Sequence, residues 1–447
     1  MGRHLFLGTI RSSFCYPRTK QNNLNVIVIG GGAAGFFGAI ACAEANPNLQ
    51  VTLIEAGTKP LAKVRISGGG RCNVTHHCFE PARLVENYPR GGKALRGAFS
   101  RFQPKDTVQW YESRGVKLKT EADGRMFPVT DSSSTIVDCL MQAADKAGVD
   151  LRTGVGVKTV KQYFDDRQKS YFQVELKNGR VMKCDRLLIA TGSNPLGYRW
   201  AKNLGHKIES SVPSLFTFNL KDPRIKDLTG VSVGDARVKL GTGKNKLEQT
   251  GALLITHWGI SGPAVLKLSA WGARSLFDLK YNSLLQINWL PKYNEEELKQ
   301  VLTEVKQTHP QKKIVNYCPV ELPKRLWQTL ISYSQIKTEK VWSEISKKEL
   351  NKLVAEIVRG QYEIKGKGVF KDEFVTCGGV SLKEINFKTM ESKLCPGLYF
   401  AGEILDIDGV TGGFNFQSAW TTSWLAGQAI ANSRVASYTK SSSQTTL

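Results

Sequence analysis

The stretch NVIVIGGGAAGFFGAIACAEANPNLQVTLIE at residues 25–55 decides the predicted fold. It opens with a β-branched run typical of a buried parallel strand, and Gly30, Gly32 and Gly35 follow as G-x-G-x-x-G. In this pattern the first glycine allows a sharp turn, the second lets a pyrophosphate approach the backbone, and the third lets helix and strand pack closely. A second apolar run ends at Glu55, where a carboxylate can accept hydrogen bonds from a ribose. We therefore predict a dinucleotide-binding βαβ unit rather than an ordinary glycine-rich turn.

A second glycine cluster, SGGGRCN at 67–73, follows this unit. Consecutive glycines let a ligand approach bare backbone. Arg71 can neutralise a phosphate, and Asn73 can hydrogen-bond a polar ring edge. Alone, the cluster is equally consistent with a flexible loop. After a dinucleotide fold, it indicates a second contact with the cofactor.

Two later segments repeat the α/β pattern. Residues 187–192 read LLIATG, a buried strand that ends in small residues and leaves room for a cofactor. Residues 398–401 predict another strand, followed by Gly402-Glu403, a glycine-rich turn and a helix from about 418 to 432. An acid after the strand can bind polyol hydroxyls, and the helix dipole can stabilise negative charge on a reduced ring. The two ends of the chain are therefore predicted to build one site.

Between these ends the sequence changes character. Residues 206–290 hold short alternating runs separated by turn residues, which predict antiparallel β structure. Residues 291–366 carry apolar stripes at helical spacing, one of them introduced by a capping box at Ser346–Glu349. We interpret these stripes as core. The predicted organisation is a leader at 1–22, a nucleotide-binding domain at 23–195 and 368–435, an insert at 196–367 and a disordered tail at 436–447.

The chain has 447 residues and a formal net charge of +23. No apolar run reaches the roughly 18 residues needed to span a bilayer. The charge predicts a positive surface potential. Basic residues occur as scattered pairs, such as Lys312-Lys313, without a dense block or known nucleic-acid-binding module. We therefore favour a solvated basic surface over a nucleic-acid partner. The sequence does not specify an oligomeric state.

Cysteine and histidine usage argues against disulfides and metals. The nine cysteines are widely spaced and include no C-x-x-C, and the six histidines form no H-x-x-H. A reducing compartment is the natural home. The first 22 residues contain arginines and serines and no acid, which is typical of a transit peptide. We expect a plastid or mitochondrial location; the alternative is a disordered bacterial N-terminus and a cytoplasmic protein.

These motifs together resemble one family. GGGAAG with Glu55, ISGGGRCNVT at 66–75, LLIATG at 187–192, LITHWGISGP at 254–263 and the segment at 375–420 are similar to the HI0933-like (BaiN/RdsA, aminoacetone-oxidase-like) family of FAD-dependent oxidoreductases. The resemblance covers about residues 24–432. It implies a glutathione-reductase-type, Rossmann-like FAD domain of the α/β class with an inserted β-barrel and helical domain.

The resemblance also implies positions for FAD. Residues expected to contact it come from four motifs: Gly30, Gly32, Ala34, Gly35 and Glu55; Gly69, Gly70, Arg71, Cys72 and Asn73; Ala190, Thr191 and Gly192; and Gly402, Glu403, Asp408, Gly412, Gly413, Asn415 and Gln417. The chain departs from bacterial members after LLIATG, where it has only SNPLGY at 193–198 in place of a longer glycine- and serine-rich loop. This difference, with THWGISGP, is closer to the cyanobacterial and plant branch.

The expected activity is hydride exchange between the flavin and a small organic substrate, with oxygen or NAD(P)H completing the cycle. No second G-x-G-x-x-G lies within a βαβ unit, so NAD(P)H would dock transiently. His257 is a candidate for proton transfer because imidazole titrates near neutrality, and its alternative role is structural. Cys72 is a candidate thiolate, and its alternative is packing. The other functions considered are an FAD enzyme acting on RNA and a flavin-binding sensor or electron carrier.

Overall fold

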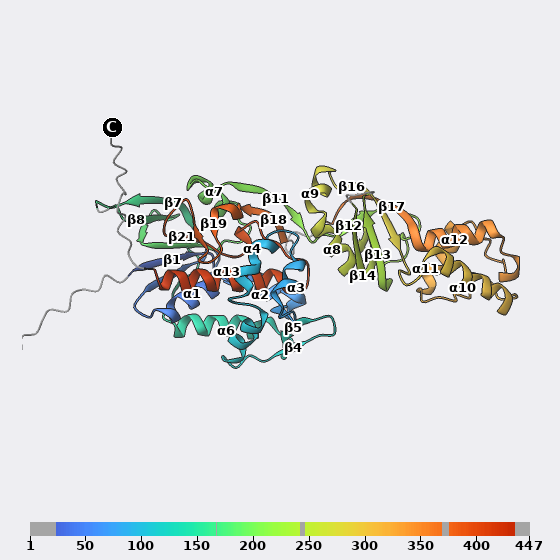
Figure 1. Ribbon diagram of the computed structural model, residues 1–447, viewed down its shortest axis with the longest axis horizontal. Helices are drawn as coiled ribbons and strands as arrows, with labels where there is room; N and C mark the ends of the chain where they lie inside the picture. The colour runs from blue at the N-terminus through green and yellow to red at the C-terminus, as the bar shows by residue number, and fades with distance from the viewer. Residues whose placement is uncertain (1–23, 167, 242–245, 369–374, 434–447) are drawn as a thin grey trace, which may run out of the picture.

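A parallel sheet forms the centre of the cofactor domain (Figure 1). The computed structural model describes residues 24–166, 168–241, 246–368 and 375–433, so the predicted leader and tail lie outside the described residues. The seven-stranded sheet has the order β19-β20-β21-β10-β1-β2-β6, with antiparallel pairing confined to the β19–β20–β21 edge. Its strands are β1 (Asn25–Ile29), β2 (Gln50–Ile54), β6 (Asp150–Arg152), β10 (Arg186–Ile189), β19 (Ile385–Asn386), β20 (Glu391–Ser392) and β21 (Leu398–Phe400).

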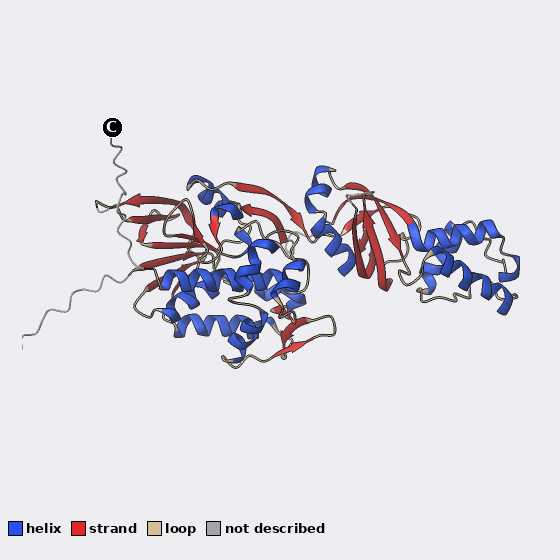
Figure 2. Ribbon diagram, viewed as in Figure 1, coloured by secondary structure: helices blue, strands red, loops and turns tan. Residues whose placement is uncertain are grey.

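Helices and a small sheet cover this central sheet. Helices α1 (Ala33–Ala45), α6 (Ser133–Lys146) and α13 (Phe414–Ala431) lie on one side. Strands β7 (Val157–Phe164), β8 (Ser170–Leu176) and β9 (Val181–Cys184) form an antiparallel sheet on the other (Figure 2). Helices α1 and α13 approach closely because Gly427 faces Gly38, and a Cβ on Gly427 would lie 2.7 Å from the Gly38 carbonyl oxygen. This contact joins the first and last helices of the domain.

Smaller elements complete the cofactor domain. They comprise α2 (Ala62–Gly70), β3 (Thr75–His76), α3 (Pro81–Leu84), η1 (Val85–Asn87), α4 (Gly92–Phe99), α5 (Pro104–Glu112), β4 (Leu118–Thr120), β5 (Arg125–Pro128), α7 (Pro195–Asn203), η4 (Leu382–Glu384) and η5 (Gly402–Ile404). Strands β11 (Ile208–Ser214) and β18 (Val375–Val380) pair antiparallel where the chain leaves and re-enters the domain.

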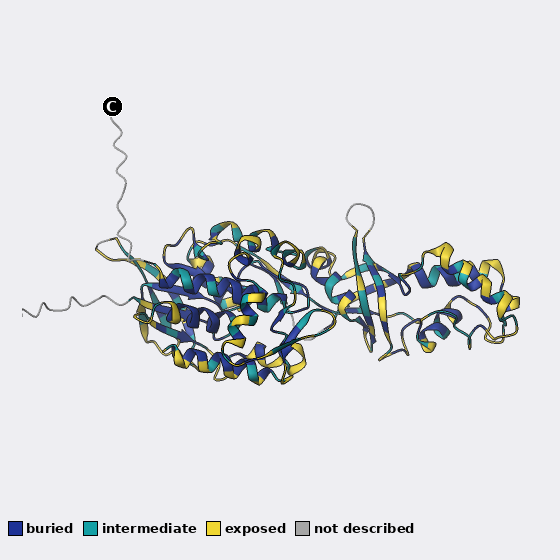
Figure 3. Cartoon of the chain, turned by 60° about the horizontal axis from the view of Figure 1, so that its bottom comes forward, coloured by how far each residue is buried: buried dark blue, intermediate teal, exposed yellow. Residues whose placement is uncertain are grey.

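The insert extends away from the cofactor domain and has its own core (Figure 3). Its closed barrel has the order β12-β15-β14-β13-β16-β17, and helices continue beyond it to the far end of the molecule. Its elements are β12 (Phe218–Leu220), β13 (Ser232–Leu240), β14 (Leu247–Thr256), β15 (Gly259–Ser261), α8 (Pro263–Trp271), α9 (Ala273–Asp278), β16 (Asn282–Asn288), α10 (Glu295–Thr308), α11 (Lys324–Tyr333), η3 (Trp342–Glu344), α12 (Lys347–Arg359) and β17 (Gly360–Lys367).

Most of the predicted elements are present. The capping box at Ser346–Glu349 begins α12, and the apolar stripe of that helix is buried in the core of the insert. Helix α13 begins at Phe414, four residues earlier than predicted, because the glycine turn continues directly into it. Residues 360–367, placed in the helical segment, instead form β17, which closes the barrel between β12 and β16. No helix in the described part of the chain is long and apolar enough to cross a bilayer.

Candidate functional site

The glycines of the first turn have the geometry that a dinucleotide requires. Gly30 has φ +112°, and a Cβ on it would lie 2.5 Å from the carbonyl oxygen of Ala190. A Cβ on Gly35 would lie 1.8 Å from the carbonyl oxygen of Gly30. A Cβ on Gly32 would meet nothing within 4 Å, and Gly32 begins α1 without a side-chain cap. Open space therefore lies at the free N–H groups of a helix N-terminus, as a pyrophosphate requires.

Glu55 lies at the carboxyl end of β2, where the sequence predicted a ribose contact. Its carboxylate accepts hydrogen bonds from the backbone N–H groups of Gly31 and Gly57, both at 2.6 Å. These bonds orient the side chain across the glycine turn while leaving it partly exposed. A carboxylate held in this way has lone pairs left for ribose hydroxyls.

The second glycine cluster forms a kinked turn at the end of α2. Gly68, Gly69 and Gly70 all have positive φ, and a Cβ on Gly69 or Gly70 would meet nothing within 4 Å. In the orientation that satisfies both of its groups, the Asn73 amide accepts a hydrogen bond from Gly413 N–H (2.9 Å) and donates to the carbonyl oxygen of Thr75 (3.0 Å). Asn73 therefore connects the two glycine motifs from opposite ends of the chain.

Arg71 has partners other than the phosphate that the sequence suggested. Its guanidinium pairs with Glu121 (2.6 Å) and Asp131 (3.5 Å) and lies 4.0 Å from the ring centroid of Phe127. Two carboxylates and an aromatic face thus hold Arg71 on the neighbouring β4–β5 hairpin. These contacts give Arg71 a structural role in addition to the phosphate contact that the sequence predicts.

Cys72, the candidate thiolate, is buried. Burial raises the pKa of the Cys72 thiol to about 12, although a hydrogen bond with Ser67 acts in the opposite direction. At neutral pH the residue is therefore a protonated, inert thiol. It packs in the core beneath the glycine cluster, as the alternative interpretation expected.

The C-terminal glycine turn lies against the second cluster. Gly412 and Gly413 have positive φ, and a Cβ on Gly413 would lie 2.5 Å from the carbonyl oxygen of Thr75. Helix α13 begins here without a side-chain cap. Asn415 both accepts from and donates to the backbone of Gly409, at 2.9 and 2.8 Å. Asn415 therefore shapes the turn.

Two polar residues of this motif are fully engaged inside the protein. Gln417 is buried; its side-chain oxygen accepts from Thr75 (2.6 Å) and Thr107 (2.9 Å), and its amide nitrogen donates to Thr421 (3.0 Å). Asp408 is also buried and is bound by the guanidinium of Arg90. The predicted contacts of these two residues with FAD stay predictions, and the side chains have internal partners in the structure.

Arg90 and Asp408 form a buried ion pair within the cofactor domain, at its boundary with the insert. Arg90 also donates to the carbonyl oxygen of Ala270 at the end of α8 (2.8 Å), and Ser214 donates to Asp408 (2.8 Å). Nearby, Arg274 of α9 lies 3.4 Å from Asp406. The sequence analysis missed Arg90, because its partners are far away along the chain.

The remaining predicted segments close the site. Gly192 has φ +59° at the end of β10, and the Thr191 hydroxyl is buried without a hydrogen-bond partner among the described residues. Gly402 packs on Ala34, since a Cβ on Gly402 would lie 2.7 Å from the Ala34 Cβ. Glu403 accepts from Thr376 N–H (3.0 Å) and pairs with Lys63 (2.8 Å).

His76 lies against the C-terminal glycine motif, whereas in the described part of the chain no hydrogen bond joins His257 to the glycine motifs. His257 is exposed on the turn after β14, and its Nδ1 and ring contact Thr229 and Trp258, both in the insert. His76 stacks on Phe414 at 4.7 Å, and its Nε2–H donates to the carbonyl oxygen of Asp123 (3.1 Å). Its Nδ1 is buried without a partner in the described structure, and burial lowers its pKa. The sequence feature that could have identified His76 is the triplet Thr75-His76-His77, which follows the second glycine cluster.

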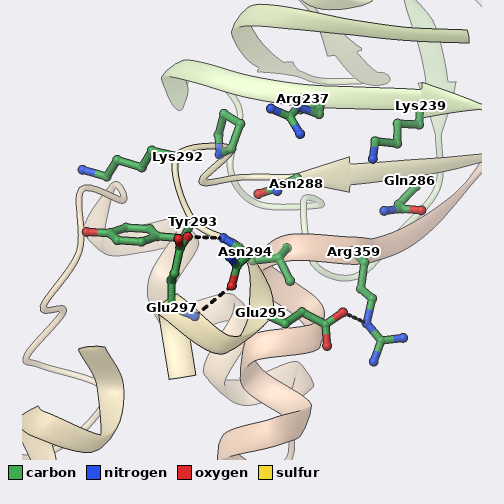
Figure 4. A pocket seen from close by; sticks show the side chains of 12 residues that line it. Arg237, Lys239, Gln286, Asn288, Lys292, Tyr293, Asn294, Glu295, Glu297 and Arg359 are labelled. Atoms are coloured by element: carbon green, nitrogen blue, oxygen red, sulfur yellow. Dashed lines mark hydrogen bonds and ion pairs between the residues drawn. The ribbon is translucent and has the colours of Figure 1, made fainter. Parts of the chain in front are cut away.

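A surface cavity of about 430 Å³ lies elsewhere, in the insert (Figure 4). It is lined by the barrel and by the start of α10, and none of the predicted site residues takes part in it. Its cations have carboxylate partners: Arg359 pairs with Glu295 at 2.5 Å, and Lys292 with Glu321 at 2.6 Å. No group of three metal-ligating side chains occurs in the described ranges.

The cofactor domain and site define a class of protein. Free N–H groups at two helix N-termini and open space beside Gly32, Gly69 and Gly70 fit a flavin dinucleotide. This is the arrangement of an FAD-binding oxidoreductase with a Rossmann-type domain.

The chain belongs to the HI0933-like family, because the model of the HI0933-like protein Rossmann domain matches residues 24–429. Curated relatives include ribosomal RNA dihydrouridine synthase from Escherichia coli, 33% identical over 421 residues, with 91% of this chain and 98% of the relative covered. Another is 3-dehydro-bile acid delta(4,6)-reductase from Clostridium scindens, 28% identical over 413 residues, with coverage of 90% and 98%.

Similar solved structures are flavoenzymes of low sequence identity. A 3-ketosteroid-delta4-(5alpha)-dehydrogenase from Rhodococcus jostii has a TM-score of 0.49 and 14% identity, with 93% of this chain and 99% of that chain covered. A flavocytochrome c3 fumarate reductase has a TM-score of 0.42 and 18% identity, with coverage of 92% and 78%.

Proposed function

We propose that this protein is an FAD-dependent reductase that saturates a carbon–carbon double bond conjugated with a carbonyl group in a small organic substrate. One observation carries the proposal: two kinds of curated relative, matched over nearly their whole length, have names that describe this reaction type. Dihydrouridine is uridine in which the ring double bond beside a carbonyl group has been saturated. The name of the bile-acid reductase describes the reduction of double bonds in a steroid that carries a 3-oxo group. The shared chemistry is narrower than that of flavoenzymes in general.

The residues that would hold FAD follow from the geometry of the site. Gly30, Gly32 and Gly35, with Ala34 at the start of α1, would accept the pyrophosphate, and Glu55 the adenosine ribose. The backbones of the second and third glycine motifs would border the ring. FAD bound there would supply a hydride at its N5 position, with NAD(P)H as the proposed source of electrons.

The chain itself would contribute a proton acceptor or donor and a dry pocket. We assign proton transfer to His76 rather than His257, because His76 stacks on Phe414 at the C-terminal glycine turn. Since a carbonyl oxygen only accepts, the bond to Asp123 keeps one proton on Nε2. The proton that completes the reduction would therefore be carried on Nδ1 of protonated His76 and donated from there to the substrate carbon, while the hydride goes to the other carbon of the double bond. The Asn73–Gly413 hydrogen bond would keep the two glycine turns in register beside the substrate.

Anaerobic reduction tests this function. The purified FAD-loaded protein is mixed with NADH or NADPH, and the flavin absorbance is followed in a stopped-flow instrument. Bleaching by one nicotinamide, followed by reoxidation with a conjugated enone but not with its saturated analogue, is the expected result. A flavin that neither nicotinamide reduces would refute the assignment as an NAD(P)H-linked reductase.

A second candidate function is the same reduction on a uracil base in RNA. Two observations favour it: the +23 net charge, and the relatives named ribosomal RNA dihydrouridine synthase at 33% and 31% identity. Incubating the reduced enzyme with unmodified ribosomal RNA and measuring dihydrouridine by mass spectrometry separates this function from the first. The proposal of a plastid or mitochondrial location is tested by fusing residues 1–22 to a fluorescent protein.

A further inference from the structure

The described surface contains an acid-free basic segment that the proposed chemistry does not use. Residues 89–105 read PRGGKALRGAFSRFQPK, with five cations and no Asp or Glu. The sequence analysis treated the basic residues as scattered pairs and did not single out this segment. Its first cation, Arg90, is the buried partner of Asp408, whereas the other four are exposed.

Helix α4 presents two of these cations on one face. Leu95, Ala98 and Phe99 are buried against the cofactor domain, while Lys93 and Arg96 are exposed at i and i+3. The exposed Arg101 and Lys105 follow in the connection to α5 and in its first turn. Arg101 donates to the carbonyl oxygen of Lys388 and so brings a fifth exposed cation alongside. We call Lys93, Arg96, Arg101, Lys105 and Lys388 the basic stripe.

No carboxylate neutralises the stripe. Within the described ranges, none of its five side chains forms an ion pair, whereas cations around the cavity of the insert do. The nearest acid in sequence, Asp106, accepts a hydrogen bond from Gln103 N–H (2.8 Å) in the capping box of α5. Unpaired cations on a fixed backbone are what a phosphate chain requires.

The position of the stripe relates it to the candidate site. Arg90 and Asp408 form a backbone bridge at the C-terminal glycine motif, and a Cβ on Gly91 would lie 2.6 Å from Ile407. Helix α4 begins at the next residue, so the stripe starts beside the site and continues along α4 towards α5. The segment contains no large exposed apolar residue, which would anchor a bilayer surface. A polyanion fits this face better than a membrane does.

We propose that the basic stripe binds the phosphate backbone of single-stranded RNA and leads it to the cofactor site. The choice of RNA among polyanions rests on the second function proposed above. Five phosphate contacts give a slope of about −3.5 for log affinity against log salt on a single strand, or a loss of about 100-fold between about 50 and 200 mM. Arginine and lysine contacts of this kind carry little base specificity.

Charge reversal tests the stripe. The FAD-loaded full chain is titrated into a fluorescein-labelled oligouridylate without electron donor, and anisotropy is measured over a range of salt concentrations. The double variant Lys93→Glu/Arg96→Glu is compared with Lys312→Glu/Lys348→Glu, which reverses two exposed lysines of the insert that have no ion pair in the described structure. Both double variants change the net charge by the same amount, so a difference between them reports the position of the charges. Flavin absorbance and thermal midpoint confirm that each variant is folded.

We expect the stripe variant to weaken binding at least 10-fold and to reduce the salt slope by about 1.4, while the control changes affinity less than about twofold. Equal losses in both variants, or no binding by the unmodified protein at low salt, would overturn the proposal. Binding to phosphatidylserine vesicles without binding to RNA would also overturn it. Because no electron donor is present, the result is independent of whether the protein reduces a small substrate.

Discussion

Replacing Arg90 with methionine would remove one half of a buried ion pair of the cofactor domain that also hydrogen-bonds to the insert. The side chain of Arg90 is 16% exposed, and that of Asp408 is 0% exposed. Asp408 would keep only the hydrogen bond from Ser214. The carbonyl oxygen of Ala270, at the end of α8, would lose the Arg90 donor.

The size of the effect follows from burial. Removing one partner of a buried, hydrogen-bonded ion pair costs about 3–5 kcal/mol, because the other charge is left in the interior. The double variant Arg90→Met/Asp408→Asn removes that charge as well, so much of the loss should return. We expect a coupling free energy of about 2–3 kcal/mol between the two positions, in the range for contacting residues. An exposed pair, Arg83 with Glu80, is worth at most about 1 kcal/mol.

Urea unfolding of the FAD-loaded protein, followed by flavin release and by far-UV circular dichroism, measures these differences. Arg83→Met is the matched control, since it removes an exposed arginine–glutamate pair from the same domain. A loss below about 1 kcal/mol for Arg90→Met, or additive losses in the double variant, would refute the reasoning.

Three further predictions concern the site. Gly35→Ala should abolish FAD binding, because its Cβ would lie 1.8 Å from the carbonyl oxygen of Gly30. The control Gly97→Ala should bind FAD normally, because nothing lies within 4 Å of its Cβ. The flavin content of each purified variant measures the difference. Cys72→Ala should retain turnover within about twofold, and iodoacetamide should leave Cys72 unmodified at pH 8, because burial raises its pKa to about 12. His76→Gln should keep FAD but lower turnover at least 10-fold. Because protonated His76 is the proposed donor and burial lowers its pKa, the rate of the unmodified enzyme should fall as pH rises through a pKa below the ordinary histidine range, and this limb should disappear in the variant. Full activity in His76→Gln would return the proton-transfer role to another group.

Local sequence patterns were sufficient for the elements that depend on neighbours along the chain. The first glycine turn, the capping box of α12 and the buried stripes were predicted because their physical cause lies within a few residues. The fold class followed from the same signals, because a glycine turn between a buried strand and a helix has few alternatives. The barrel was expected only through the family resemblance. The residues of β17, the strand that closes it, were predicted to be helical.

Partners of polar side chains were the part that sequence could not provide. Arg90 binds Asp408 across 318 positions of the chain, Gln417 binds Thr75 across 342, and Arg71 binds Glu121 across 50. A motif identifies the residue type that a cofactor needs, but a carboxylate or guanidinium binds whichever partner the fold brings within reach. Gln417, Asp408 and Arg71 were therefore assigned to FAD and found bonded within the protein.

The sequence by itself determined that a dinucleotide domain is built from both ends of this chain, because glycine spacing and buried β-branched runs are local constraints on the backbone. Only the tertiary structure decided which groups face the site. It buried Cys72 as an inert thiol, exposed His257 in the insert and stacked His76 on Phe414. The physical reason is that burial and proximity, which set pKa and hydrogen bonding, arise from contacts between segments that are remote in sequence.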